Sequence, residues 1–271
     1  MAIYITGDLH REGWIIGDFT RNCKTTQEDI LILLGDAGFN FYADKRDHDL
    51  KEKAAQYPIT IFSIHGNHEI RPENIPTYQK ISWKGGTAYA EEEFPNLIFA
   101  RCGEIYDLNG IRTMPIGGAH SIDKNSRIEY RREDGWCGWW EDEEPTDEIK
   151  ARVEDRLDKE SWKIDVILSH TCPIQLFKKL INTMKNFSDS SILMKIKHGV
   201  HRAEEWLETI EQRLDYKKWY FGHYHKSRGF NRFMCLYNDI LEFTTDPESG
   251  YPYDWKKSGK FVFSLGRMRR P

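Results

Sequence analysis

The sequence predicts an α/β protein in which buried strands are joined by helical crossovers. Three observations favour this class. Short apolar runs recur along the chain and alternate with patterns typical of helices. Several of these runs end at a glycine that is followed at once by a polar residue, as at Gly7, Gly35 and Gly66. The 271 residues, of which 39% are hydrophobic, are enough for one large domain with a sizeable core.

The first part of the chain alternates expected strands with a helix. Residues 2–6 and 29–34 are apolar runs that predict buried strands, and each is closed by a Gly-Asp turn. Residues 47–56 are rich in Lys, Glu and Ala and predict a helix. Pro58 then leads into a third strand, which ends at Gly66.

The middle of the chain predicts shorter strands and then a long loop. Three apolar runs predict strands at residues 97–100, 104–108 and 111–116. Asn109-Gly110 separates the last two and is typical of a hairpin turn. Residues 123–144 are polar and aromatic without clear periodicity, so we expect a loop. Because loops of this length are usually functional, we interpret the region 120–145 as a lid or loop.

The last part of the chain returns to helices and strands. Residues 145–159 predict a helix, because a proline opens the segment and Ile149, Val153 and Leu157 recur at helical spacing. Another helix is expected at 202–213, and residues 183–197 are partly helical in pattern. Further strands are expected at residues 164–168, 218–221, 232–237 and 241–244. We find no internal repeat or linker, so we expect a single domain over 1–271. Its basic tail, 252–271, should be loosely ordered apart from 261–263.

Composition excludes several classes of protein. The net charge of −4 gives no general reason to expect nucleic-acid binding, although the basic tail keeps such a contact as a secondary alternative. Five scattered cysteines without a Cys-x-x-Cys pair indicate neither a disulfide framework nor a thiolate zinc site. A reducing, cytoplasmic location is the simplest interpretation. The N-terminus does not resemble a signal peptide, and no run is long enough to span a membrane.

Polar residues that can bind a metal follow five of the expected strands. In open α/β sheets, sites lie just beyond the carboxyl ends of strands, so we expect these residues to meet at one rim. They are Asp8 with His10, Asp36, Asn67 with His68, His170, and His223 with His225. Each residue alone has an ordinary structural explanation, such as a turn or a hydrogen-bonded histidine. Five strand ends that all carry ligand-type residues are hard to explain in that way.

The donor set suggests both the metal and the substrate. Carboxylates, imidazoles and an amide oxygen, without a thiolate, suit Mn, Fe, Zn or Ni better than Mg or Ca. Two divalent ions, partly neutralised by Asp8 and Asp36, would leave a net positive site that attracts a phosphate. Ions about 3.5–4 Å apart can clamp phosphoryl oxygens and hold a hydroxide for in-line attack. Asp36 is the candidate for a bridging carboxylate.

Five motifs carry a resemblance to a known family. They are Gly7-Asp8-Leu9-His10, Gly35-Asp36, Gly66-Asn67-His68-Glu69, Ser169-His170 and Gly222-His223-Tyr224-His225. Together they resemble the successive motifs of the calcineurin-like metallophosphoesterases. The resemblance covers the chain from about Ile3 to His225 and implies a four-layer α/β/β/α sandwich of two mixed sheets flanked by helices.

The resemblance also implies a role for each residue. Asp8, His10 and His225 would bind one metal ion. Asn67, His170 and His223 would bind the other, and Asp36 would bridge the two. His68 would not be a ligand, but would donate a hydrogen bond or a proton to the phosphate or the leaving group.

The sequence departs from the family pattern in two places. Phe39 stands where the family usually has Asp or Asn, with Asn40 one position later. Arg11 follows the first motif where glycine is frequent, and it is a candidate substrate contact. The arginine-rich signatures of the protein serine/threonine phosphatases are not evident.

Residues 117–127, Gly117 to Arg127, supply further candidates. Two glycines follow an expected strand, and similar segments occur in bacterial and phage members of the family. If the segment is functional, His120 or Arg127 would contact the substrate; a tight surface loop is the alternative. The tryptophans at 136, 139 and 140 could form an aromatic lid that stacks on a ring, or a small local core.

We therefore expect a dinuclear metal-dependent phosphoesterase that uses metal-activated hydroxide, with Mn²⁺ supporting activity in vitro. Phosphomonoesters and phosphodiesters both remain open as substrates. The alternatives are a nucleic-acid-processing nuclease or phosphatase of the same superfamily, and a catalytically silent binding protein on this fold.

Overall fold

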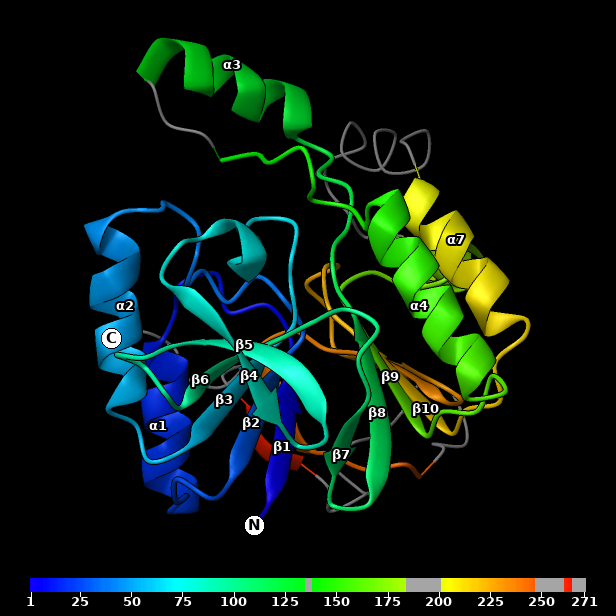
Figure 1. Ribbon diagram of the computed structural model, residues 1–271, viewed down its shortest axis with the longest axis horizontal. Helices are drawn as coiled ribbons and strands as arrows, with labels where there is room; N and C mark the ends of the chain where they lie inside the picture. The colour runs from blue at the N-terminus through cyan, green and yellow to red at the C-terminus, as the bar shows by residue number, and fades with distance from the viewer. Residues whose placement is uncertain (135–137, 184–200, 247–260, 265–271) are drawn as a thin grey trace.

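Two mixed β-sheets face each other in the computed structural model, and helices cover their outer sides (Figure 1). The structure describes residues 1–134, 138–183, 201–246 and 261–264. This is the four-layer arrangement expected from the sequence. Among the described residues, none of the helices combines the length and the apolar character needed to cross a bilayer.

The first sheet has eight strands in the order β14-β13-β1-β2-β3-β6-β5-β4. Its centre is parallel and is formed by β1 (Ile3–Thr6), β2 (Ile30–Leu33), β3 (Thr60–Ser63) and β6 (Leu97–Ala100). Antiparallel strands flank it: β13 (Asp239–Glu242), β14 (Phe261–Ser264), β5 (Gly86–Glu91) and β4 (Tyr78–Trp83).

The second sheet has six strands in the order β11-β12-β10-β9-β8-β7. The parallel strands are β8 (Ile111–Ile116), β9 (Val166–Ser169), β10 (Lys218–Phe221) and β12 (Phe233–Cys235). The edges are antiparallel and are formed by β7 (Tyr106–Leu108) and β11 (Arg228–Phe230). The turn between β7 and β8 has Asn109 and Gly110 at positive φ, which is the hairpin expected from the sequence.

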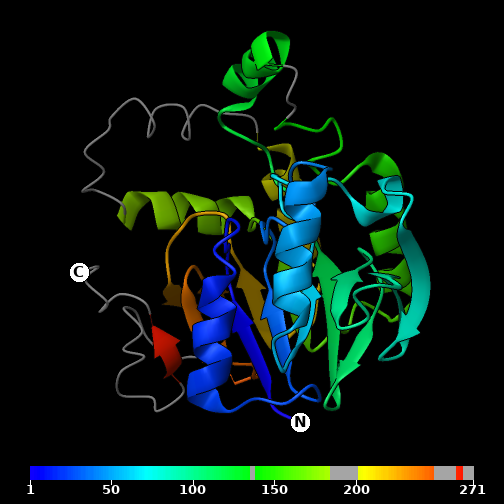
Figure 2. The same ribbon diagram turned by 90° about the vertical axis from the view of Figure 1, so that its left-hand side faces the viewer.

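Helices α1 (Trp14–Cys23) and α2 (Lys45–Ala55) lie side by side on the first sheet (Figures 1 and 2). The second sheet is covered by α4 (Asp147–Lys159), α5 (Ile174–Thr183) and α7 (Arg202–Glu211). A 3-10 turn, η1 (Pro72–Asn74), follows β3 and its loop. Helix α3 (Lys124–Asp134) projects from the body of the molecule on the side opposite the N-terminus (Figures 1 and 2).

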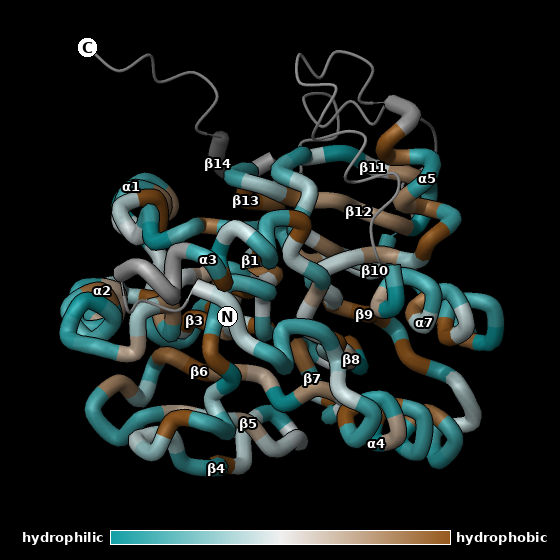
Figure 3. The backbone as a smooth tube through the Cα atoms, turned by 90° about the horizontal axis from the view of Figure 1, so that it is seen from above, coloured by the Kyte–Doolittle hydropathy of each residue, from teal (hydrophilic) through white to brown (hydrophobic). Residues whose placement is uncertain are grey.

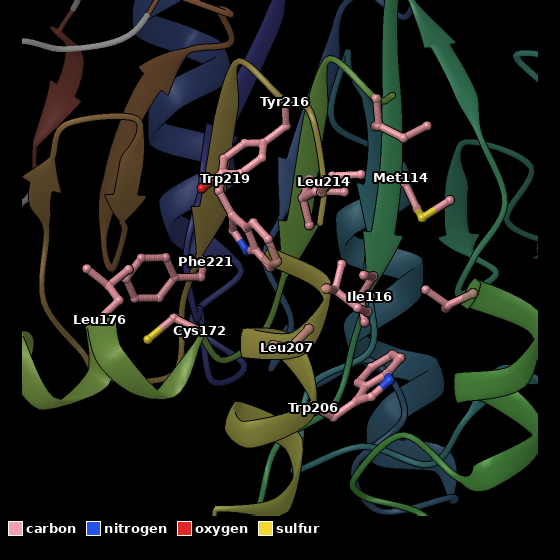
Figure 4. Close-up of a cluster of buried hydrophobic side chains, with 14 of the residues drawn as sticks. Met114, Ile116, Cys172, Leu176, Trp206, Leu207, Leu214, Tyr216, Trp219 and Phe221 are labelled. Carbon is pink, nitrogen blue, oxygen red and sulfur yellow. The ribbon is translucent and has the colours of Figure 1, made fainter. Parts of the chain in front are cut away.

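Strand residues alternate between three buried clusters, as the two-residue period of a strand requires. Ile30 and Ile32 of β2 point into the cluster between the sheets, whereas Leu31 and Leu33 pack in the cluster that includes α1. The third cluster lies between the second sheet and its helices, where Trp219 of β10 lies toward Leu207 of α7 and Phe221 lies beside Leu176 of α5 (Figure 4). Hydrophobic residues accordingly concentrate in the strands, while the outer helices contain both hydrophobic and hydrophilic residues (Figure 3).

The structure corrects one expectation and adds elements that were not expected. The region predicted as a loop, 123–144, contains α3. Helices α1 and α5 and the β4–β5 hairpin were not predicted. Strand β14 agrees with the order expected at 261–263, whereas the rest of the tail from 252 and almost all of 183–197 lie outside the described residues.

Candidate metal centre

The residues that follow five parallel strands meet at one rim shared by the two sheets. Asp8 follows β1, Asp36 follows β2 and Asn67 follows β3, all in the first sheet. His170 and His223 follow β9 and β10 of the second sheet. A hydrogen bond across the rim joins the two sheets. His170 Nδ1, on the second sheet, lies 2.6 Å from the carbonyl oxygen of Leu34, on the first.

Asp8, His10 and His225 form a first group of donors. One ligand atom from each lies within 4.8 Å of the other two. The Nε2 atoms of His10 and His225 are 2.7 Å apart, and His225 Nε2 is 3.4 Å from Asp8 Oδ2. Asp8 Oδ2 is buried and accepts no hydrogen bond within the described part of the chain. A cation among these atoms would satisfy that oxygen, so the group fits a divalent metal ion.

Asn67, His170 and His223 form a second group. Asn67 Oδ1 is 2.8 Å from His170 Nε2 and 3.0 Å from His223 Nδ1. The amide is held in this orientation because its Nδ2 donates to Ser121 Oγ at 2.8 Å. An oxygen and two imidazole nitrogens therefore converge, and these N/O donors also fit a divalent transition metal.

Asp36 lies beside the second group. Its Oδ2 is 3.4 Å from His170 Nε2 and 3.8 Å from His68 Nε2, and its Oδ1 accepts from the His68 backbone N–H at 2.9 Å. Burial opposes ionisation, but His68 and His170 outweigh it and hold the pKa of Asp36 well below its usual range. The carboxylate is therefore ionised at neutral pH.

Burial sets the protonation of the other groups. It lowers the pKa of His225 to about 4 and also lowers the pKa of His10 and His223, so these rings are neutral at pH 7. Neutral imidazole is the form that binds a metal. Burial, opposed mainly by His170, raises the pKa of Asp8 to about 7. His170 differs, because Asp36 and Asp8 overcome its burial and raise its pKa to about 9.

The backbone at the rim is in an uncommon conformation. Four of the candidate ligands have left-handed φ values: His10 (43°), Asp36 (49°), His223 (69°) and His225 (50°). Non-glycine residues adopt this region rarely, and such strain concentrates at functional sites. Close approach also explains Gly66, because a Cβ there would lie 2.0 Å from Asp36 Oδ1.

His68 and Arg127 lie together next to the donors. The rings of His68 and His10 are 5.7 Å apart between centroids, and Arg127 Nη2 is 3.4 Å from His68 Nε2. Arg127 belongs to α3 and is fixed by Asp123 (Nε to Oδ2, 2.7 Å) and by the Gly138 carbonyl oxygen (Nη1, 2.9 Å). Burial lowers the pKa of His68 to about 4. The negative charge of Asp36 raises this pKa, and the positive charge of Arg127 lowers it further. The projecting helix α3 thus brings a guanidinium to the centre.

The other two candidate substrate contacts have different partners. Arg11 Nη1 donates to the Gly38 carbonyl oxygen and pairs with Asp47, so its guanidinium fastens the segment 38–47. His120 faces Glu143 and Glu144. Both side chains therefore have partners within the protein, and their role as substrate contacts stays a prediction. Of the tryptophans, Trp139 lies under the Lys124 ammonium group and Trp140 packs against Phe41, whereas Trp136 lies outside the described residues.

Sequence reasoning missed Ser121. The side chain is 1% exposed, and its hydroxyl orients the Asn67 amide. The available signal was the glycine pair before it. Gly118 N–H donates to the His65 carbonyl oxygen at 2.8 Å, and a Cβ on Gly117 would lie 2.5 Å from that same oxygen. These contacts bring the segment against the end of β3.

The layers and the site define a class of protein: an α/β sandwich that gathers carboxylate, imidazole and amide donors where the strands of two facing sheets end. The model of the calcineurin-like phosphoesterase family matches residues 1–227, and the chain belongs to this family. Metal-dependent phosphoester hydrolysis is the general activity of the family, and its members generally bind divalent metal ions. The match spans all five strand-end motifs and confirms the resemblance seen in the sequence. A search of curated protein sequences gives no match.

Proposed function

We propose that the protein is a dinuclear metal-dependent phosphoesterase. Asp8, His10 and His225 would hold one ion. Asn67, His170 and His223 would hold the other, with Asp36 between them. The observation that carries this proposal is the meeting of two donor groups at one rim, where Asn67 Oδ1 faces two imidazoles and His10 Nε2 lies 2.7 Å from His225 Nε2. Four of these residues are buried: Asp8, Asp36, Asn67 and His170.

The proposed ions would act as Lewis acids on the phosphoryl oxygens and provide a nucleophile from water at neutral pH. The protein residues tune this chemistry through their charge. Neutral imidazoles and the Asn67 amide add no negative charge, so the centre keeps a positive balance that attracts a phosphate. Asp36, which is ionised, neutralises part of the charge where the two donor groups meet.

His68 and Arg127 are proposed to bind and orient the phosphate ester. Arg127 has two of its nitrogens held by Asp123 and Gly138, which presents Nη2 toward His68 and the donors. A fixed guanidinium is well suited to phosphate oxygens. His68 lies beside Asp36 without belonging to either donor group, and its neutral ring would donate an N–H hydrogen bond to the phosphate or the leaving oxygen.

We further propose Mn²⁺ as the ion that supports activity in vitro, with Fe, Zn or Ni as alternatives, since the donors are mixed nitrogen and oxygen. Both phosphomonoesters and phosphodiesters fall within the proposal. A reducing, cytoplasmic location is supported by the four described cysteines, which are free thiols: Cys23, Cys102, Cys172 and Cys235.

A direct experiment compares Asp36→Asn with the wild type. Protein stripped with a chelator and reloaded with Mn²⁺ should hydrolyse p-nitrophenyl phosphate or bis(p-nitrophenyl) phosphate. Asp36→Asn should lower kcat at least about 100-fold, because it removes the charge next to both donor groups. Asp18→Asn on the surface of α1 is the matched control and should retain activity. Failure of the wild type to bind any transition metal would sink the proposal, and so would two bound ions without hydrolysis of either ester.

A further inference from the structure

A second set of metal-type side chains lies outside the centre described above. His120 follows β8, and Glu143 and Glu144 precede α4. His120 Nδ1 is 3.5 Å from Glu143 Oε1 and 3.6 Å from Glu144 Oε2. One donor atom from each of the three residues lies within 4.8 Å of the other two.

Several donor atoms of this set are buried without a hydrogen bond. The Glu143 side chain is 2% exposed, and its Oε2 accepts no hydrogen bond from the described residues. His120 Nδ1 and Glu144 Oε1 are also buried and have no hydrogen-bond partner within the described part of the chain. The separations of 3.5 and 3.6 Å are too long for good hydrogen bonds. Buried polar atoms normally have partners, so an unpartnered atom on each of these three neighbouring side chains requires an explanation.

Metal coordination accounts for the same distances. Nitrogen and oxygen ligands lie about 2.0–2.2 Å from zinc in tetrahedral sites, which places neighbouring ligand atoms roughly 3.3–3.6 Å apart. The two measured separations agree with this range. A histidine with two carboxylates is also a suitable donor set for such an ion.

The local charge favours a cation. Glu204 of α7 is 3% exposed and lies nearby; burial, with a smaller contribution from Glu144, raises its pKa to about 7, so it adds only part of a negative charge at neutral pH. Arg202 pairs with Glu144 at 3.1 Å, but its side chain is 67% exposed. The other neighbouring guanidinium, on Arg71, lies 3.6 Å from Asp142. Glu143 and Glu204 therefore have no arginine or lysine partner among the described residues.

We propose that His120, Glu143 and Glu144 form a third cation site, for a divalent transition-metal ion such as Zn²⁺ or Mn²⁺. The site does not depend on the proposed hydrolytic activity. It lies close to the centre through Ser121, whose N–H donates to Glu143 Oε1 at 3.2 Å and whose hydroxyl accepts from Asn67 Nδ2. The ion would fix the segment that leads to α3 and hold Ser121 where it orients the Asn67 amide.

Metal content tests the site. Chelator-stripped wild type and Glu143→Gln are loaded with Zn²⁺, dialysed and analysed by plasma mass spectrometry. Glu143→Gln should bind one ion fewer per chain, because the amide keeps the shape of the side chain but loses its charge. This difference is expected however many ions the wild type holds at the centre, so failure of the proposed dinuclear site would be distinguishable. Equal metal content in the two proteins would overturn the third site.

Two further variants keep the test decisive. Asp49→Asn is the matched control, since Asp49 belongs to a group of similar donors that are partly or fully exposed, His48, Asp49 and Glu52, and should retain the wild-type content. Arg202→Ala removes the cation that competes for Glu144, so it should bind the third ion several-fold more tightly. Unchanged or weaker binding in Arg202→Ala would mean that the cluster is only an ion-pair network. If Glu143→Gln fails to fold by circular dichroism, Glu144→Gln carries the same expectation.

Discussion

Arg127 is a residue whose importance depends on where its helix places it. It does not follow a strand, but α3 brings its Nη2 within 3.4 Å of His68 Nε2. We predict that Arg127→Ala lowers kcat/KM by about 10–100-fold, equivalent to about 1.4–2.7 kcal/mol of transition-state stabilisation, because a fixed cation near the phosphate is lost. Steady-state kinetics with the better of the two chromogenic esters would measure this effect.

Metal analysis separates this role from metal binding. Arg127→Ala should retain the wild-type number of ions, and Arg127→Lys should recover part of the rate because the charge remains. Arg101→Ala, which removes the ion pair with Glu104, serves as the control. An unchanged kcat/KM in Arg127→Ala, or a loss of metal that accounts for the fall, would contradict the assigned role.

At the same scale, the sequence predicted residues that follow strands better than residues that support them. Asp8, Asn67 and His170 could be recognised because each comes directly after an apolar run. Ser121 could not, since a serine hydroxyl becomes informative only when Asn67 Nδ2 is seen 2.8 Å away. The structural role of Arg11 could not be predicted for the same reason, because its partner Asp47 is 36 positions away in the chain.

At the scale of elements, a buried ion pair joins α2 to β5, the strand next to the edge strand β4 of the first sheet. Lys51 of α2 bonds to Glu91 of β5, and the two side chains are 7% and 10% exposed. We predict that Lys51→Met lowers the free energy of unfolding by about 3 kcal/mol, because it leaves the Glu91 carboxylate buried without its cation. Urea denaturation would measure the change.

The double variant Lys51→Met/Glu91→Gln should recover most of this loss. Glutamine removes the unpaired charge but can still accept the hydrogen bond that Thr77 Oγ1 donates to Glu91 Oε1. Recovery would show that the destabilisation comes from the buried, unpaired charge of Glu91 rather than from altered packing. A double variant that is less stable than Lys51→Met would be evidence against this explanation.

The elements that the sequence did not predict have local signals that were weak or misleading. Helix α1 begins without a side-chain cap and contains Gly17, which is normally unfavourable in a helix. That glycine is needed, because a Cβ there would lie 2.8 Å from the Tyr57 ring. The β4–β5 hairpin turns at Lys84-Gly85, both at positive φ, instead of at the more familiar Asn-Gly or Asp-Gly.

At the scale of the whole molecule, the α/β class followed from the sequence but the division into two sheets did not. Strand β2 reads Ile-Leu-Ile-Leu and is buried on both faces, so its pattern cannot show which layer each face meets. The same holds for β9. Only the resemblance to a known family implied two sheets, and the register between parallel strands then explains why five loops reach one rim.

Glu204 links the layers on the second side of the molecule. It lies on α7 and accepts from Thr171 Oγ1, after β9, at 2.7 Å, and that hydroxyl is also 2.6 Å from the Tyr224 hydroxyl, after β10. Burial, with a smaller contribution from Glu144, raises the pKa of Glu204 from 4.5 to about 7. The folded protein therefore keeps a proton on Glu204 that the unfolded chain releases above pH 4.5.

This difference makes the stability of the whole fold depend on pH. Below pH 4.5 the carboxyl is neutral in both states and has no electrostatic cost. As pH rises from 4.5 to 7 the folded state loses stability, and above pH 7 the buried charge costs on the order of 1–3 kcal/mol.

We predict that Glu204→Gln raises the free energy of unfolding by this amount at pH 8 and changes it little at pH 4.5. Urea denaturation in the presence of a chelator would measure both values, with exposed Glu205→Gln as the control. An equal effect of Glu204→Gln at the two pH values would mean that packing, and not the buried charge, sets the contribution of this residue.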